Sequence, residues 1–247
     1  MVSAPPERSV RFRPDIEGLR AVAVLMVLGY HAGVPGFGGG FAGVDVFFVI
    51  SGFLITGLLV AEVERSGRID LRRFWARRAR RLLPAAVTVL VITALLTWWL
   101  IPQSRWRDIG GDVVASALYV VNWRLADRSV DYLAEDVAAS PVQHYWSLAV
   151  EEQFYVLWPL LMLLGVVLWR RRLATRPQVR RHRTPPGPRP FLAAVLAGLV
   201  LVSLGWSLVR TTGAPEVAFF DTGTRLWELG LGGLVAVGAP LLLELPR

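Results

Sequence analysis

The chain has 247 residues, of which 54% are hydrophobic, and its mean hydropathy of +0.47 excludes an ordinary soluble domain. Its formal net charge of +8 comes wholly from arginine, because the sequence contains no lysine. These arginines cluster between apolar runs, a pattern typical of cytoplasmic membrane-protein loops rather than of a nucleic-acid-binding face. The absence of cysteine excludes cysteine-ligated metals, and three scattered histidines lack paired spacing, so we expect no metal site.

Residues 1–15 form a polar segment with three arginines, which we expect to be a cytoplasmic tail. The first apolar run, residues 18–33, has Arg20 near its beginning and His31 inside it. Eleven positions separate the two, close to three helical turns, so their side chains point in nearly the same direction. The run therefore predicts a membrane span with a cation at its surface and an imidazole roughly 16 Å deeper. The alternative is a polar residue held by a neighbouring helix.

A glycine-rich loop, residues 33–40, is expected outside and precedes a second span over residues 44–61. This span places Asp45 at its outer end. A carboxylate there needs a cation or hydrogen-bond donors. It either caps the helix N-terminus or orients and charge-balances an imidazole such as that of His31.

The densest basic stretch in the first half, residues 62–81, is predicted to be cytoplasmic. Within it, Arg78 and Arg81 share one helix face and can chelate a phosphate through their guanidinium groups. Anchoring of the loop to the cytoplasmic side explains this charge equally well. The third span is predicted over residues 82–101, with Pro84 in its first turn, where a missing amide is tolerated.

Three long apolar runs follow in the second half of the chain, at residues 146–169, 191–209 and 226–243. The basic, proline-containing stretch 170–190 is predicted to be a cytoplasmic loop. For the run before it to end inside, residues 113–123, too short to cross comfortably, must be re-entrant or lie at the outer interface. The predicted fold class is therefore all-α: a polytopic transmembrane helix bundle with about six spans and one short re-entrant or interfacial helix.

Polar residues gather where the run at 146–169 begins. At helical spacing, four of them form one stripe: His144, Ser147, Glu151 and Tyr155. Such a stripe should not face lipid, so it belongs to a site or serves as polar packing between helices. The last run again sets an arginine three residues before a glutamate, Arg225 and Glu228, which can form an ion pair within one helix.

Several of these patterns occur together in one known family. Ten residues stand between Arg20 and His31. The other motifs are Gly-Val-Asp-Val-Phe-Phe-Val-Ile-Ser-Gly-Phe at 43–53, Arg-Arg-x-x-Arg-Leu-x-Pro at 77–84, His-x-Trp-Ser-Leu-x-Val-Glu-Glu-Gln-Phe-Tyr at 144–155 and Arg-x-Trp-Glu at 225–228. In this order they resemble the acyltransferase-3 family of membrane O-acyltransferases, which includes lipopolysaccharide and peptidoglycan acetylases, over essentially the whole chain.

The resemblance implies an acyl-CoA donor, with acetyl-CoA expected, reached from the cytoplasm, and an acceptor hydroxyl on a carbohydrate or glycolipid outside. It also implies a multi-pass protein of the cell membrane with a cytoplasmic N-terminus. Members of the family look like bundles of about ten spans. We therefore expect residues 1–247 to be a single acyltransferase domain that is the N-terminal portion of a larger, C-terminally truncated unit.

For the chemistry, neutral His31 is predicted to take the proton from the acceptor hydroxyl as it attacks the acyl carbon, since an imidazole exchanges protons near neutral pH. A covalent acyl-histidine relay is the variant that the sequence leaves open. By resemblance, Asp45 and Glu151 support the histidine or the acceptor, Arg20, Arg78 and Arg81 bind the donor phosphates, and Ser147, Tyr155, Arg225 and Glu228 contact substrate.

Two other classes of function remain open from the sequence. A transporter would use His31, Asp45 and Glu151 as a buried proton or substrate path, and would move substrate without consuming acyl-CoA. An inactive or scaffolding fragment would keep the fold but lack turnover.

Overall fold

The computed structural model describes residues 13–129, 139–174 and 187–243. Throughout these ranges every regular element is a helix, as predicted. In chain order the elements are α1 (Pro14–His31), η1 (Gly40–Ala42), α2 (Gly43–Ser66), α3 (Leu71–Leu100), η2 (Gln103–Arg105), α4 (Trp106–Ala117), α5 (Val121–Ser129), α6 (Tyr145–Ala174), α7 (Arg189–Gly213), α8 (Pro215–Phe220) and α9 (Thr222–Leu243).

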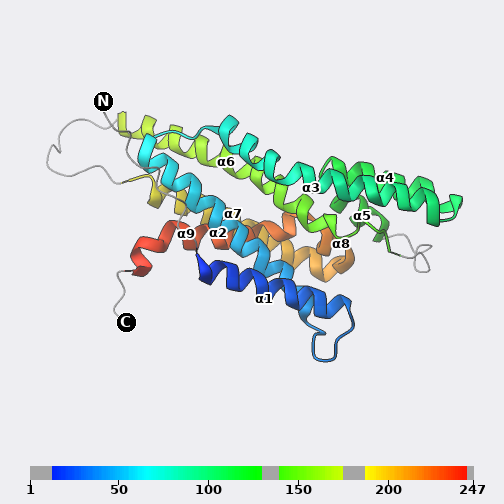
Figure 1. The fold of residues 1–247 in the computed structure, drawn as a ribbon. Coiled ribbons are helices and arrows are strands. Elements are labelled where there is room, and N and C mark those ends of the chain that lie inside the picture. The colour runs from blue at the N-terminus through cyan, green and yellow to red at the C-terminus, as the bar shows by residue number, and fades with distance from the viewer. Residues whose placement is uncertain (1–12, 130–138, 175–186, 244–247) are drawn as a thin grey trace.

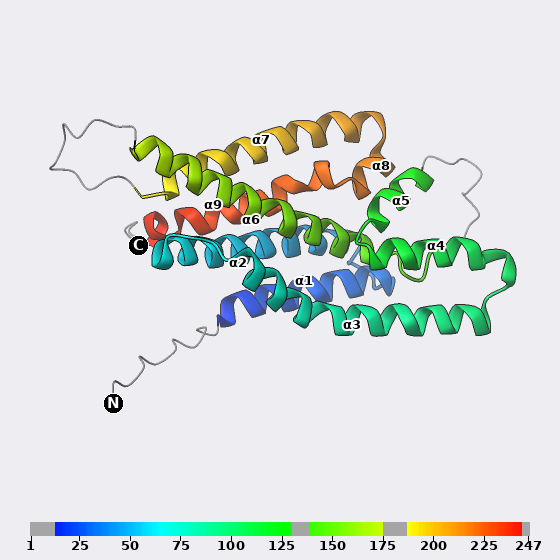
Figure 2. The ribbon, with the colours of Figure 1, turned by 90° about the horizontal axis from the view of Figure 1, so that it is seen from above.

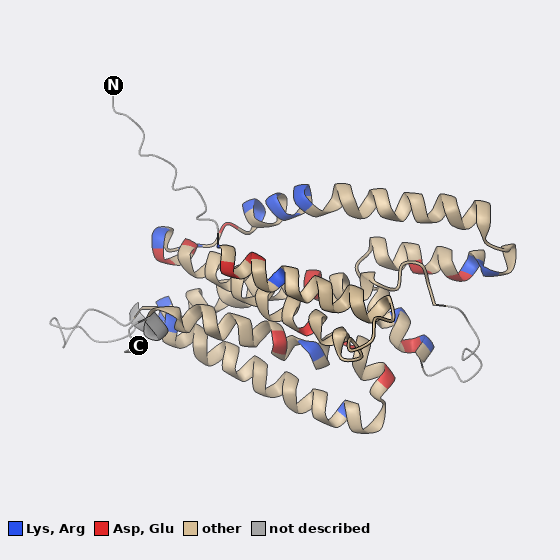
Figure 3. Cartoon of the chain, turned by 60° about the horizontal axis from the view of Figure 1, so that its bottom comes forward, with Lys and Arg blue, Asp and Glu red and all other residues tan. Residues whose placement is uncertain are grey.

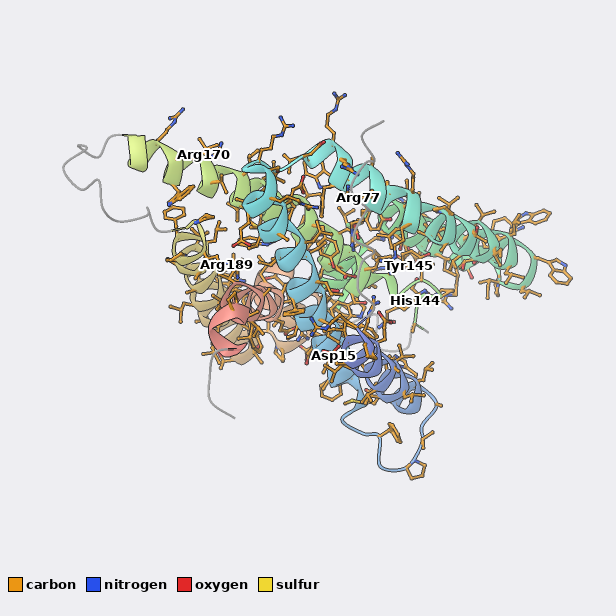
Figure 4. The ribbon with its side chains drawn as sticks, turned by 60° about the vertical axis from the view of Figure 1, so that its left-hand side comes forward. Asp15, Arg77, His144, Tyr145, Arg170 and Arg189 are labelled. Atoms are coloured by element: carbon orange, nitrogen blue, oxygen red, sulfur yellow. The ribbon has the colours of Figure 1, made fainter. Side chains whose placement is uncertain are left out.

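The long helices run side by side (Figure 1). The start of α1, the α2–α3 turn and the last turns of α6 and α9 face one end of the molecule, and the α1–α2 loop and the α7–α8 connection lie at the other. Arginines gather at the first end (Figure 3), which we call the basic end; the opposite one is the far end. Arg170 and Arg189, near the ends of α6 and α7, belong to the basic end (Figure 4). This asymmetry is the one expected if the basic end faces the cytoplasm.

Four helical segments of the described chain are long and apolar enough to cross a bilayer. They are Gly40–Ser66, Leu71–Leu100, Tyr145–Arg171 and Arg189–Gly213. The remaining two predicted spans correspond to α1, which carries Asp15, Glu17 and Arg20 in its first two turns, and to α9, which carries Arg225 and Glu228. The all-α membrane bundle is therefore confirmed, and the number of six crossings stays a prediction.

The basic stretch predicted as a cytoplasmic loop is mostly helical. α2 ends at Ser66 and is followed by Gly67, which adopts the left-handed conformation with φ 69°, and α3 already begins at Leu71. Asp70 caps that helix by accepting a hydrogen bond from the backbone N–H of Arg73 at 2.9 Å. Because this cap starts α3 well before the apolar run, Pro84 lies inside the helix, and its predicted place in the first turn is wrong.

Two predicted segments reach beyond the described residues. Of the predicted tail, positions 1–12 lie outside them, and α1 begins at Pro14. Of the predicted loop 170–190, the first part continues α6 to Ala174 and the last residues start α7, while positions 175–186 lie outside the described residues.

Residues 113–123 fall in a helical hairpin formed by α4 and α5. α4 runs from the far end toward the middle of the bundle, the chain turns at residues 118–120, and α5 leads back (Figure 2). Asp112 of α4, 1% exposed, joins the two helices by bonds to Arg124 Nε at 2.7 Å and Arg128 Nη1 at 2.9 Å. The hairpin thus enters and leaves at the same end, the geometry expected of a re-entrant element.

The main core lies between α2, α6, α7 and α9. Its fully buried members include Phe48, Phe154 and Trp158, and the Trp158 indole N–H donates to Thr56 Oγ1 at 2.9 Å. α9 crosses α2 at glycines, because a Cβ atom on Gly232 would lie 1.9 Å from a backbone carbonyl oxygen of α2. This close crossing brings the polar residues at the start of α9 against α2.

Candidate functional site

Three consecutive polar residues of α6 face three different neighbours. Successive helical residues point about 100° apart, so Glu151, Glu152 and Gln153 together cover a wide arc. Glu151 accepts a hydrogen bond from the Ser51 hydroxyl of α2, and Glu152 pairs with Arg78 of α3. Gln153 bonds to the α4–α5 hairpin and to α9. α6 is therefore the central helix of the candidate site.

The first group of polar residues, which we call the α6 cluster, consists of Ser51, Arg78, Glu151, Glu152 and Tyr155. Arg78 contacts Glu152 Oε1 through Nη2 at 2.6 Å and Nε at 2.7 Å, and Glu151 Oε1 at 3.8 Å. The Tyr155 hydroxyl donates to Glu151 Oε1 at 2.5 Å, and the Arg78 guanidinium lies 3.3 Å from the centroid of that phenol ring. Glu151 is thus held by two hydroxyls and one cation, and the cluster has one more carboxylate than guanidinium.

Gln153 extends this cluster into a network of amides and hydroxyls. Its Nε2 donates to the backbone oxygen of Tyr119 at 2.8 Å and to Asn122 Oδ1 at 3.0 Å, and its Oε1 accepts from Thr222 Oγ1. Asn122, which is fully buried, donates in turn to Phe220 O at 3.0 Å. The tip of the α4–α5 hairpin is therefore fixed to α6 and to the start of α9.

The second group, the α9 cluster, joins α2 to α9 through Asp45, Arg225 and Glu228. Arg225 Nη1 lies 3.2 Å from Asp45 Oδ1 and 3.0 Å from Glu228 Oε1. Glu228 is 1% exposed, and its Oε2 has no hydrogen-bond partner among the described residues. The predicted ion pair within α9 is confirmed, and the carboxylate that joins it comes from a different helix.

The structure does not bring His31 together with the carboxylates predicted to support it. His31 is the last residue of α1, its side chain is exposed, and its Nδ1 lies 2.8 Å from the carbonyl oxygen of Val27. Asp45 pairs with Arg225 and Glu151 belongs to the α6 cluster, so neither contacts the imidazole. The structure therefore does not show Asp45 charge-balancing His31, because an arginine of α9 supplies its cation.

The predicted donor-binding arginines occupy different environments. Arg20 forms a 3.4 Å pair with Glu17 one turn away on α1. Arg78 is held in the α6 cluster, with its side chain 19% exposed. The side chain of Arg81 is exposed and forms no hydrogen bond or ion pair with another described residue. Of the two arginines predicted to share one helix face, only Arg78 therefore points into the bundle, and Arg81 is exposed.

Only two of the four residues predicted to form a polar stripe at the start of α6 bond to each other through their side chains. Glu151 and Tyr155 are bonded to one another, whereas Ser147 donates to the backbone oxygen of His144 at 3.4 Å and lies outside the α6 cluster. His144 precedes the helix, beside α3 (Figure 4). Burial lowers the pKa of its imidazole, and a backbone hydrogen bond partly opposes that shift.

The sequence analysis assigned no role to several residues of these networks, namely Ser51, Asn122, Glu152, Gln153 and Thr222. The same holds for Trp75, whose indole N–H donates to the backbone oxygen of Tyr155. For Glu152 and Gln153, the sequence did contain a feature that indicates buried polar partners. Glu152 and Gln153 continue the polar run of Glu151 in an apolar helix, and three consecutive polar residues cannot share one face. Each then requires its own polar partner, which means protein on several sides of α6.

A cavity of about 340 Å³ opens beside the α6 cluster, between α3, α6 and the tip of the α4–α5 hairpin. Its polar lining comes from Trp75, Arg78, Tyr119, Glu152 and Gln153, and the rest is apolar. A smaller cavity of about 230 Å³ follows along α3 toward His144 and shares Leu82 with the first. In the described part of the chain no group of acidic and histidine side chains is arranged to hold a metal ion.

Known proteins share this sequence over nearly its full length. The peptidoglycan O-acetyltransferase of Listeria monocytogenes is 35% identical over 230 residues, which are 92% of this chain and 34% of that protein. A Bacillus subtilis protein provisionally named a peptidoglycan O-acetyltransferase is 36% identical over 234 residues, or 94% of this chain and 34% of the relative. The chain thus spans about a third of the length of these curated relatives.

No solved structure matches the chain significantly. The model of the acyltransferase-3 family, described as an acyltransferase domain, matches residues 13–244. This range includes both polar clusters and all the residues predicted for the site. The chain therefore belongs to the acyltransferase-3 family.

Proposed function

We propose that the protein is a membrane O-acyltransferase that moves an acetyl group from cytoplasmic acetyl-CoA to a hydroxyl of a cell-envelope carbohydrate. The family and the names of the relatives support this reaction class, and those names favour peptidoglycan as the acceptor. The localisation that goes with it is the cell membrane, with the N-terminus in the cytoplasm.

The observation that carries the proposal is the α6 cluster. Its residues come from three of the membrane-capable helices and place two carboxylates and one guanidinium between them. Ionisable groups within membrane segments are costly and mark functional paths. Glu151, fixed by Ser51 and Tyr155, is the carboxylate that we assign to support of the reacting groups.

The other predicted residues lie near opposite ends of the helices, which fits two substrates that arrive from opposite sides. Arg20 lies in the second turn of α1, and Arg78 and Arg81 lie in the third and fourth turns of α3, in the half of that helix nearer the basic end. We assign this end to the donor. Exposed Arg81 is the guanidinium free to bind a donor phosphate, and Arg78 positions the neighbouring carboxylates.

The acceptor side is assigned to the far end. His31 ends α1 there, Ser147 lies in the first turn of α6, and the α9 cluster joins the starts of α2 and α9. The Nδ1 contact of His31 with a backbone carbonyl leaves Nε2 as the basic nitrogen. Nε2 takes the acceptor proton while the hydroxyl oxygen attacks the acyl carbon and the C–O bond forms. The C–S bond then breaks, the imidazolium returns the proton to the sulfur, and coenzyme A leaves as the free thiol.

The test is an incubation of membranes containing the protein with acetyl-CoA labelled in the acetyl group. Label in the envelope glycan, absent from membranes without the protein and strongly reduced for His31→Gln, is the expected result. Substrate movement without consumption of acetyl-CoA would instead identify a transporter. If the folded protein consumed no acetyl-CoA, the result would contradict the proposal.

A further inference from the structure

The cavity beside the α6 cluster contains one polar group that the protein leaves free. The Trp75 indole N–H donates to Tyr155 O at 3.0 Å, Arg78 and Glu152 bind one another, and both ends of the Gln153 amide are bonded. Among the polar side chains lining this cavity, only the Tyr119 hydroxyl makes no hydrogen bond to a described residue. Its phenol lies within electrostatic range of Glu152 and Arg78.

The backbone at Tyr119 is strained. Its φ of 56° makes it the only non-glycine residue of the described chain with a positive φ. The amide of Val120 donates to Ala115 O at 2.8 Å and that of Tyr119 to Ser116 O at 3.1 Å, which is the Schellman arrangement at the end of α4. Glycine is the usual residue at this left-handed position, and a bulky side chain there is unfavourable.

This strain is held in place from α6. Gln153 Nε2 donates to the backbone oxygen of Tyr119 at 2.8 Å, and the paired Asp112 and Arg124 hold the two helices of the hairpin together. Strained residues that the surrounding structure holds in this way concentrate at functional sites. A tyrosine in place of glycine therefore points to a use for its side chain.

We propose that Tyr119 is a substrate-contacting residue on the donor side. Its hydroxyl donates a hydrogen bond to the carbonyl oxygen of the acyl thioester while the thioester is bound in this cavity, before the transfer at the far end. The inference rests on the proposed acyltransferase function. The chemistry of the cavity favours the acyl end of the donor over a carbohydrate. A sugar presents many hydroxyl groups that need partners, whereas the cavity offers apolar walls and one free hydroxyl, which matches the single carbonyl of a thioester.

The test compares Tyr119→Phe and Tyr119→Gly with the wild-type protein, using kcat and KM for acetyl-CoA together with the midpoint of thermal unfolding. Tyr119→Phe keeps the ring and removes a hydroxyl that has no partner in the described protein. We expect kcat/KM to fall about tenfold, the effect of one lost hydrogen bond to substrate, with the midpoint unchanged. Tyr119→Gly should lose at least as much activity. Relief of the backbone strain should offset part of the stability lost with the ring, which packs against a buried apolar cluster.

Tyr145→Phe is the matched control, since the Tyr145 hydroxyl donates to the backbone oxygen of Ala86 at 3.0 Å. This variant removes a hydroxyl that is bonded within the protein and should therefore lower the unfolding midpoint, whereas Tyr119→Phe should not. Wild-type kcat/KM in Tyr119→Phe would overturn the role of Tyr119 and leave the proposed function intact. Failure of the wild-type protein to use acetyl-CoA would instead overturn the proposed function and the inference with it.

Discussion

The crossing of α2 and α9 offers a sharp test of the fold that positions the α9 cluster. In Gly232→Ala, the new Cβ atom would lie 1.9 Å from the carbonyl oxygen of Val49 and 2.8 Å from the amide nitrogen of Phe53. Both are backbone atoms, so no side chain can rotate away. Ordinary contact begins near 3.4 Å, and the two helices must therefore move apart by about 1.5 Å at this point.

Overpacking of this kind costs about 1–3 kcal/mol, and a clash between two backbones belongs at the upper end of that range. Replacing glycine by alanine in a helix returns about 0.5–1 kcal/mol, so Gly232→Ala should be destabilising by about 2 kcal/mol. Separation of the helices also weakens the 3.2 Å contact between Arg225 and Asp45. The assay is thermal unfolding of the purified protein in detergent, combined with acetyl transfer per folded molecule.

Gly238→Ala is the control on the same helix, because nothing lies within 4 Å of a Cβ atom at that position. It should be neutral or stabilising by up to about 1 kcal/mol, through helix propensity alone. Equal unfolding midpoints for Gly232→Ala and Gly238→Ala would refute the close crossing of α2 and α9.

Three further predictions address the site and the orientation. His31→Gln should lower acetyl transfer by about 10²-fold, the scale of lost general-base catalysis, with expression and donor binding retained; near wild-type transfer would make His31 a packing residue. Arg81→Ala should weaken acetyl-CoA affinity without loss of stability, and Arg81→Lys should retain part of that affinity. In contrast, Arg78→Ala leaves Glu152 unpaired, and thermal unfolding should show a destabilisation of about 3 kcal/mol. A single cysteine introduced at Ser66 should react with impermeant reagents only from the cytoplasmic side, and labelling from outside would reverse the proposed topology.

Periodicity and charge predicted the helical membrane bundle because they depend on properties of each segment alone. The same information placed Glu151 and Tyr155 on one stripe of α6, and the structure joins them at 2.5 Å. It also predicted the pair of Arg225 and Glu228, which is confined to one helix. Local spacing is sufficient to predict a contact wherever both partners belong to one helix.

Contacts between different helices could not be predicted from local spacing. Asp45 and Arg225 lie 180 positions apart, and only the close crossing of α2 and α9 brings them together. Without that crossing, His31 of the preceding helix was the basic residue nearest to Asp45 in the sequence. The start of α3 was missed for a related reason, because the cap at Asp70 outweighs the change from basic to apolar composition further along the helix.

The positions of the charged residues restrict how acyl transfer can proceed in this bundle. Exposed Arg81 lies toward the basic end and the imidazole of His31 at the far end. If the donor binds at Arg81 and the acceptor at His31, as we propose, the acyl group must pass part of the bilayer between them. The two cavities along α3 share Leu82 and extend from Trp75 to Val89, a helical rise of roughly 21 Å. Because α6 lines both cavities and carries Glu152 and Gln153 on the wall of the first, these polar residues lie where a group moving from the proposed donor side to the proposed acceptor side would pass.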